Sequence, residues 1–142
     1  MDLIKIYQCL SDRTRLRILH LLSRGPLCVC HFQELLDEPQ VKISKHLGYL
    51  KEKGLVVAQR HQNWMIYALP ANPAPVLEAN LQCLEDCPDP VFTADLHRLS
   101  TIRTKLRWID GISTCASRGS RRREPTTQRA TRRPALAGGS RQ

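Results

Sequence analysis

The chain has 142 residues and a formal net charge of +9 at neutral pH. This length allows one compact domain with a tail, and it excludes a separate catalytic domain beside it. Residues 111–142 hold eight of the 22 Lys and Arg residues and only one of the 13 Asp and Glu residues. Residues 1–110 therefore carry a net charge of only +2. If residues 1–110 bind a nucleic acid, their basic side chains must therefore be concentrated on one face.

Six cysteines are compatible either with the disulfide framework of a secreted protein or with reduced thiols. Asp2 and Lys5 interrupt the first apolar residues, so we expect no secretory signal there. No apolar run approaches the roughly 18 residues that cross a bilayer. We therefore expect a cytoplasmic protein with reduced thiols and no membrane role.

Two helices are predicted near the N-terminus. The apolar residues of 3–10 recur at helical spacing, which predicts a short first helix that includes Cys9 on its apolar side. A broader apolar stripe over 13–23 follows Asp12, whose carboxylate is a common helix N-cap. Gly25 stands just past the end of this stripe, as is typical of a helix C-terminus.

A helix-turn-helix pattern comes next. Residues 28–36 have helical apolar spacing, and Pro39 then breaks the pattern. Residues 41–53 form a half-polar helix that ends at Gly54, and its apolar face consists of Ile43, Leu47 and Leu50. A short helix, a tight turn and a half-polar helix together are typical of a helix-turn-helix.

A β-hairpin is predicted after these helices. Residues 55–60 and 64–69 are rich in Val, Ile, Trp and Tyr, and three polar residues separate them. This hairpin is the expected wing. With a helix over 76–87, the order is α-α-α-α-β-β-α, a mainly α winged helix-turn-helix with a small β-hairpin.

The C-terminal part divides into a helix and a tail. We expect a further helix from Phe92 to about Ile109. From Gly111 the composition shifts to Arg, Ser, Thr, Gly and Pro, which predicts a disordered, Arg-rich tail over 111–142. The expected DNA-binding and dimerisation domain is therefore 1–110.

Four segments in this order resemble the ArsR/SmtB family of metal-responsive repressors. They are LSDRTRLRILHLL (10–22), LCVCHF (27–32), ISKHLGYLKEKGLV (43–56) and WMIYAL (64–69). In that family, LCVC before the turn is typical of arsenic, antimony, cadmium and lead sensors. The resemblance implies a repressor of a metal or metalloid resistance operon, which binds double-stranded operator DNA as a homodimer and is not an enzyme.

The resemblance also implies the inducer and the dimer contact. As(III) or Sb(III) is the expected inducer, with Cd(II), Pb(II) or Zn(II) as alternatives. The dimer contact is expected on the first and last helices, over 3–10 and from Val76 onward. Two positions depart from the arsenic-sensor pattern: Gln33 stands where a third cysteine is often found, and His31 replaces the usual acidic residue.

The candidate metal ligands are cysteines, because thiolates are soft donors that select thiophilic ions. Cys28 and Cys30 are the first pair, with buried apolar roles as the alternative. On a regular helix they point about 200° apart, so we expect ion binding to distort the start of their helix. Cys83 and Cys87 lie four residues apart and are the candidate source of a third thiolate, from the same subunit or its partner.

The candidate DNA contacts are polar residues of the second helix of the motif and of the wing. We expect the helix to present them outward into the major groove, and they are Lys42, Ser44, Lys45, His46 and Tyr49. Arg60, with His61, is expected to reach phosphate or the minor groove from the wing. The alternative for these residues is an ordinary solvated surface.

Three other functions remain open from the residues alone. The cysteines are compatible with a thiol–disulfide enzyme, although the chain has no C-x-x-C pair. They are also compatible with a thiol-redox-responsive regulator. In a zinc-stabilised interaction module they would be structural, and zinc removal would unfold the protein.

Overall fold

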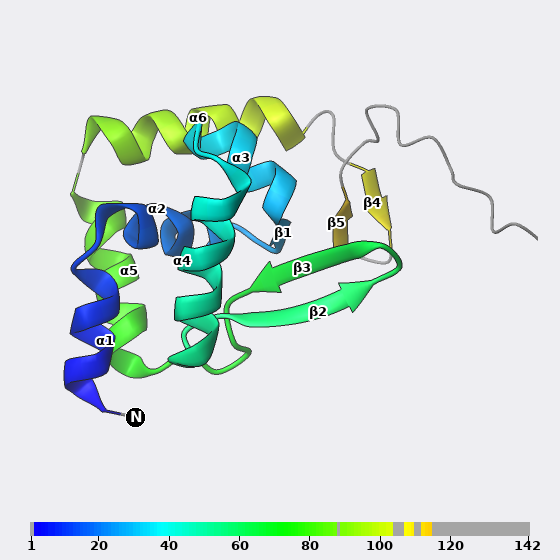
Figure 1. Ribbon diagram of the computed structural model, residues 1–142. Coiled ribbons are helices and arrows are strands. Elements are labelled where there is room, and N and C mark those ends of the chain that lie inside the picture. The colour runs from blue at the N-terminus through cyan, green and yellow to red at the C-terminus, as the bar shows by residue number, and fades with distance from the viewer. Residues whose placement is uncertain (1, 88, 104–106, 110–111, 115–142) are drawn as a thin grey trace, which may run out of the picture.

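The computed structural model describes residues 2–87, 89–103, 107–109 and 112–114 (Figure 1). Its helices are α1 (Leu3–Leu10), α2 (Arg13–Leu22), α3 (Val29–Leu36), α4 (Gln40–Glu52), α5 (Pro75–Asp86) and α6 (Pro90–Arg103). Its strands are β1 (Leu27–Cys28), β2 (Val57–His61), β3 (Trp64–Ala68), β4 (Arg107–Ile109) and β5 (Ile112–Thr114). The predicted winged helix-turn-helix is therefore present, with α3 and α4 as the motif and β2–β3 as the wing.

Acidic N-caps begin the first two helices. The carboxylate of Asp2 accepts a hydrogen bond from the Ile4 amide at 3.0 Å. The carboxylate of Asp12 accepts a hydrogen bond from the Arg15 amide at 2.9 Å. Each satisfies a backbone donor that the helix leaves unpaired, as the sequence predicted for Asp12.

The core lies between α2, α3 and α4. Fully buried side chains include Leu19, Phe32, Ile43, Leu47 and Leu50. Burial of each such side chain contributes about 1.5–3 kcal/mol relative to exposure. Because the apolar face of α4 is fixed in this core, its opposite face is left for solvent or a ligand.

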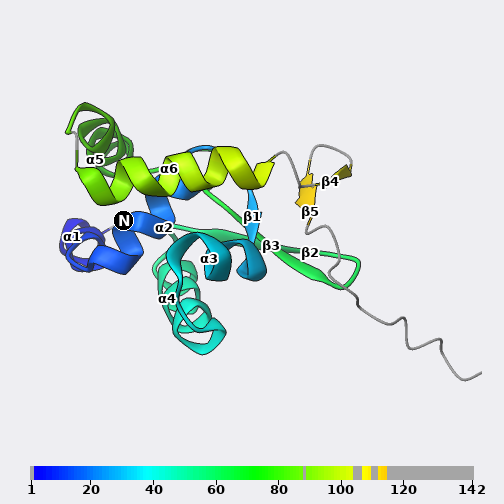
Figure 2. The ribbon, with the colours of Figure 1, turned by 90° about the horizontal axis from the view of Figure 1, so that it is seen from above.

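Helix α6 runs across α2 and α3 and is held by two arginine contacts (Figures 1 and 2). Arg17 of α2 makes a bidentate ion pair with the buried Asp95, with N–O distances of 2.7 and 2.8 Å. Arg98 donates to the carbonyl oxygen of Leu35 at 3.0 Å, near the end of α3. These contacts tie α6 to α2 and to α3, the helix that precedes α4.

The sheet has the order β1-β3-β2 and is antiparallel. Leu27 pairs with Tyr67 and Cys28 with Ile66, so β1 joins the wing to the start of α3. A tight turn closes the β2–β3 hairpin between His61 and Trp64. Within the described part of the chain, no helix is both long and apolar enough to span a membrane.

Three expectations from the sequence need correction. Strand β1 was not predicted, because two residues are too short for a periodic signal and their pairing depends on the distant β3. The last helix ends at Arg103 rather than near Ile109, and 107–109 is a strand. Strand β5 over 112–114 falls within the stretch expected to be disordered. The rest of the expected tail, 115–142, lies outside the described residues.

Candidate functional site

Cys28 is at the junction of β1 and α3. It is buried, and its extended backbone (φ −96°, ψ 166°) makes it the N-cap of α3 rather than a helical residue. One ligand atom from each of Cys28, Cys30 and His31 lies within 4.8 Å of the other two. The premise that Cys28 and Cys30 both lie on a regular helix is therefore wrong, because the chain turns between them; the expected distortion on ion binding stays a prediction.

His31 is the third member of this cluster. Its Nδ1 accepts a hydrogen bond from the Cys28 amide at 3.2 Å, the role that Glu or Gln has in a capping box. The ring proton is therefore on Nε2, which is buried with no hydrogen-bond partner among the described residues. Burial lowers the pKa of His31 to about 4, so the imidazole is neutral at physiological pH, the form that binds metals.

The five cysteines in the described part of the chain differ in state. Cys9, Cys28, Cys83 and Cys87 are not in disulfides. Cys30, half-buried at the second position of α3, is in a disulfide. A disulfide sulfur is not a thiolate, so Cys30 binds a thiophilic ion only after reduction. Cys115 lies outside the described residues.

A pocket of about 340 Å³ adjoins the two cysteines. Besides Cys28 and Cys30, its lining residues are Val29, Gln33, Gln40, Asn63, Trp64 and Met65. Gln40 is the first residue of α4, and Asn63 and Trp64 are at the tip of the wing. The pocket therefore touches both elements with which a winged helix-turn-helix contacts DNA.

The other cysteine pair is elsewhere in the fold. Cys83 is on α5 and Cys87 is its C-cap, and both are exposed. Helix α5 lies beside α1, away from β1 and the start of α3 (Figure 1). Neither residue belongs to the cluster around Cys28, so a single chain does not bring the four predicted ligands together.

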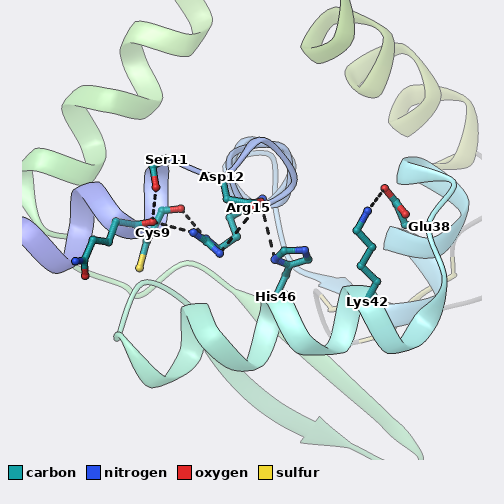
Figure 3. Close-up of polar contacts among 8 residues, drawn as sticks. Cys9, Ser11, Asp12, Arg15, Glu38, Lys42 and His46 are labelled. Carbon is teal, nitrogen blue, oxygen red and sulfur yellow. Dashed lines mark hydrogen bonds and ion pairs between the residues drawn. The ribbon is translucent and has the colours of Figure 1, made fainter.

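The free face of α4 is composed of polar and small residues. Lys42, Ser44, Lys45 and Gly48 are exposed, and Val41 has an exposed fraction of 81%. Lys42 also makes an ion pair with Glu38 at 2.7 Å (Figure 3). On the wing, Arg60 is exposed. These positions agree with the outward orientation expected for Lys42, Ser44, Lys45 and Arg60.

His46 and Tyr49 do not have the expected outward orientation. His46 points from α4 toward Asp12 (Figure 3), and burial lowers its pKa. The Tyr49 ring lies under the Arg15 guanidinium, 4.6 Å from its centroid. Both side chains are half-buried, because they flank the apolar stripe of α4 where α2 packs against it.

Comparison with known proteins identifies the family. The profile described as "Bacterial regulatory protein, arsR family" matches residues 12–57. The arsenical resistance operon repressor of Escherichia coli (strain K12) is 39% identical over 88 residues, which are 58% of this chain and 75% of that protein. The chain belongs to the ArsR family. A second ArsR relative, the arsenic resistance transcriptional regulator ArsR1 of Pseudomonas putida, is 34% identical over 96 residues, 67% of this chain and 75% of the relative.

Solved structures support the same fold. The transcriptional repressor BigR from Xylella fastidiosa has a TM-score of 0.54 at 23% identity, covering 61% of this chain and 87% of that one. HlyU from Vibrio cholerae N16961 has a TM-score of 0.53 at 24% identity, covering 58% and 87%. These confirm the predicted architecture. Since ArsR-family proteins are DNA-binding regulators, the chain is a transcriptional regulator and not an enzyme.

Proposed function

We propose that this ArsR-family protein represses a metalloid resistance operon and leaves its operator when As(III) or Sb(III) binds Cys28 and Cys30. The observation that carries the proposal is the pocket in which these cysteines face Gln40 of α4 and Trp64 of the wing. The names of the relatives support the inducer: two are arsenic regulators and another is a cadmium resistance regulatory protein CadC homolog from Staphylococcus aureus. Cd(II) is therefore an alternative inducer, and Pb(II) and Zn(II) are the others that the sequence leaves open.

The donor set suits a thiophilic ion. The two cysteines offer soft thiolates once Cys30 is reduced, and His31 offers an imidazole nitrogen in the same cluster. A neutral His31 has one unprotonated ring nitrogen, which already accepts the hydrogen bond from the Cys28 amide. It cannot use that nitrogen to bind an ion and keep this hydrogen bond. Ion capture by His31 therefore removes a hydrogen bond that fixes the start of α3, the helix on which α4 packs.

The proposed DNA surface is the free face of α4 with the tip of the wing. Lys42, Ser44 and Lys45 are exposed on α4 and would enter the major groove of double-stranded operator DNA. Arg60 would contact a phosphate or the minor groove from the wing. From their half-buried places, His46 and Tyr49 would act by holding α4 against α2.

The proposed assembly is a homodimer that forms through α1 and α5. Helix α1 leaves Leu3, Ile4 and Tyr7 51%, 63% and 50% exposed, and α5 lies beside it (Figure 1). An apolar face of this kind is typical of a protein–protein contact. Two copies would present two α4 helices to a two-fold operator, in a cytoplasm that keeps thiols reduced.

The test is a DNA-binding titration on the region upstream of the protein's own gene, with a phosphine reductant and increasing As(III), Sb(III), Cd(II), Pb(II) or Zn(II). We expect As(III) or Sb(III) to release the DNA at the lowest concentration. Cys28→Ser should bind the DNA but not respond, because a hard donor replaces a soft one. Cys83→Ser is the matched control and should respond like the parent. Release of the Cys28→Ser variant at the parent's As(III) concentration would refute the proposal.

A thiol-redox-responsive regulator is the second candidate, favoured by the disulfide at Cys30. In that case an oxidant alone would release the DNA, and the reductant would restore binding without any ion. Under the first proposal, DNA affinity in the presence of reductant depends on the ion.

A further inference from the structure

One side of α4 carries two acid–base pairs (Figure 3). The Lys42 ammonium lies 2.7 Å from the Glu38 carboxylate, and His46 Nδ1 lies 3.9 Å from the carboxylate of Asp12. The shorter pair joins the first turn of α4 to the loop that precedes this helix. One of the cations on the proposed DNA surface therefore already has an anion beside it when no DNA is bound.

The backbone of the loop places Glu38 next to Lys42. Asp37 ends α3 in the left-handed conformation, with φ 53°, and Pro39 is the N-cap of α4. Glu38 lies between these two residues and outside both helices, so the pair is not the i,i+4 pair of a continuous helix. The loop conformation, and not helical spacing, thus brings the carboxylate to the ammonium.

Helix stability does not account for a lysine at this position. The N-terminus of a helix has a partial positive charge, which anions stabilise and cations in the first turn destabilise. Lys42 is the third residue of α4, and the first turn of this helix contains no acidic residue. A cation there is useful only toward an anion outside the helix. In the protein without DNA, that anion is Glu38.

The Glu38 charge acts on other cations as well. The pKa of Arg17 is raised mainly by its hydrogen bond to Asp95, and to a smaller extent by the Glu38 charge. Burial lowers the pKa of His46, and two carboxylates, of which Glu38 is one, oppose that shift. Because residues 1–110 have a net charge of only +2, Glu38 removes a large part of the positive charge available to a polyanion.

The pair is open to exchange with a phosphate. The side chains of Lys42 and Glu38 are 47% and 24% exposed, and an ion pair in such a position contributes little to stability. A backbone phosphate has the same sign of charge as the carboxylate and offers oxygen acceptors to the same ammonium. Lys42 can therefore leave Glu38 for a phosphate while the loop keeps its conformation.

We propose that Glu38 is an internal competitor for the DNA backbone: its carboxylate occupies the position beside Lys42 that a phosphate takes in the complex. Lys42 changes partner when the protein binds DNA, and the released carboxylate, now close to the phosphates, takes up a cation from solution. Glu38 thereby limits the affinity for DNA of any sequence, because phosphate contacts carry no sequence information. The exchange requires the proposed DNA surface on α4 and thus rests on the proposed function.

The test measures the affinity of the full chain for a random-sequence duplex at several salt concentrations, with reductant and without inducer. Glu38→Gln keeps the size of the side chain and removes its charge. It should raise the affinity about 5-fold and make the slope of log K against log salt steeper by about 0.9 for each subunit bound. Glu34→Gln, the matched control, removes the same charge from an exposed position of α3 and should change the affinity less than about 2-fold.

A double-variant cycle shows whether Lys42 changes partner. If Glu38 holds this lysine only in the protein without DNA, Lys42→Ala should weaken binding about 3-fold more in the Glu38→Gln background than in the parent. A general effect of net charge does not produce this difference. Two results would overturn the exchange: equal losses in the two backgrounds, or a gain in Glu38→Gln no larger than that in Glu34→Gln.

The duplex has a random sequence and no inducer is present, so failure of the repressor proposal has a separate signature. A chain that does not prefer the region upstream of its own gene, or that does not respond to As(III), would contradict that proposal and leave the result of the cycle unchanged.

Discussion

His46 of the recognition helix faces Asp12, the N-cap of α2, with its Nδ1 3.9 Å from the carboxylate Oδ1 (Figure 3). The same carboxylate accepts a hydrogen bond from the Arg15 amide, and the Arg15 guanidinium lies over the ring of Tyr49. Polar contacts at the start of α2 therefore add to the buried apolar face of α4 in positioning this helix. A DNA-binding helix held in this way presents its free face in one orientation.

The first prediction separates positioning from contact on α4. His46→Ala should lower the free energy of unfolding by about 1 kcal/mol and also weaken DNA binding, since it removes a half-buried side chain. Lys45→Ala should weaken DNA binding and leave the free energy of unfolding within about 0.5 kcal/mol of the parent, because Lys45 is exposed. Urea unfolding and a DNA titration measure the two effects. An unchanged urea midpoint for His46→Ala would contradict the positioning role.

The second prediction concerns pH. Burial lowers the pKa of His46, while the Asp12 charge opposes that shift. In the unfolded chain the pKa of this histidine is about 6.5, so below that pH the unfolded chain binds a proton that the folded chain binds less readily. The free energy of unfolding is therefore at its full value above this pH and falls as the pH decreases. His31, with a pKa of about 4, adds a loss of the same sign. The free energy of unfolding, measured in urea, should therefore decline from pH 7 to pH 5, and the decline should be shallower in His46→Gln. An identical decline in the parent and the variant would contradict this prediction.

Asp12 contributes in a separate, more acidic range. Burial raises its pKa, but the hydrogen bond from the Arg15 amide and the Arg15 charge outweigh burial and give a net lowering. Its stabilisation is therefore present above the unfolded value of about 4 and lost at lower pH. The decline between pH 7 and pH 5 consequently reports on the histidines.

The third prediction concerns the ion pair that holds α6. Asp95→Ala leaves the half-buried Arg17 guanidinium without its carboxylate and should lower the free energy of unfolding by about 3 kcal/mol. Glu38→Ala, which breaks the exposed pair with Lys42, should cost less than about 1 kcal/mol. Chemical unfolding of both variants checks the contrast. Equal effects would show that α6 is not anchored by this pair.

The periodicity of apolar residues was sufficient to predict α1 to α5 and the wing. Each of these elements buries one face against the core, and the apolar residues of that face recur at a regular spacing in the sequence. This periodicity could not predict β1, whose two residues depend on pairing with β3. The orientation of Cys28 follows from that pairing, so the compact cluster with Cys30 and His31 could not be predicted either. The inward orientation of His46 depends on how α2 packs on α4, which no local pattern contains.

The fourth prediction concerns base recognition by Val41. This residue is 81% exposed in the first turn of α4, where a recognition helix contacts bases. Its methyl groups suit the C5-methyl of thymine. Replacing the contacted thymine by uracil should weaken binding of the parent about 5-fold, and Val41→Ala should remove most of that preference.

A thymine-to-uracil scan of the operator, measured by DNA titration, locates the contacted base. Ser44→Ala is the matched control, because it changes the same helix face without removing an apolar contact. A scan with no sensitive thymine would contradict this role of Val41.

The last prediction adds a third thiolate to the Cys28 pocket, and it rests on the proposed repressor function. Gln33 lines this pocket and follows Cys30 by three residues on α3, so its side chain lies on the same helix face. Gln33→Cys should give inorganic As(III) a third sulfur and lower the As(III) concentration that releases DNA by at least about 10-fold. Glu34→Cys is the control: Glu34 follows Cys30 by four residues but is exposed and does not line the pocket, so its thiol adds no donor there and the variant should respond like the parent.

Both variants are titrated with a phosphine reductant, since dithiol reductants bind arsenic themselves and Cys30 must be reduced to act as a ligand. If Gln33→Cys and Glu34→Cys release DNA at the same As(III) concentration, the ion is not held at this face of α3. Because a third sulfur strengthens the site only where two already bind, a selective gain at residue 33 locates the inducer between β1, α3 and the wing.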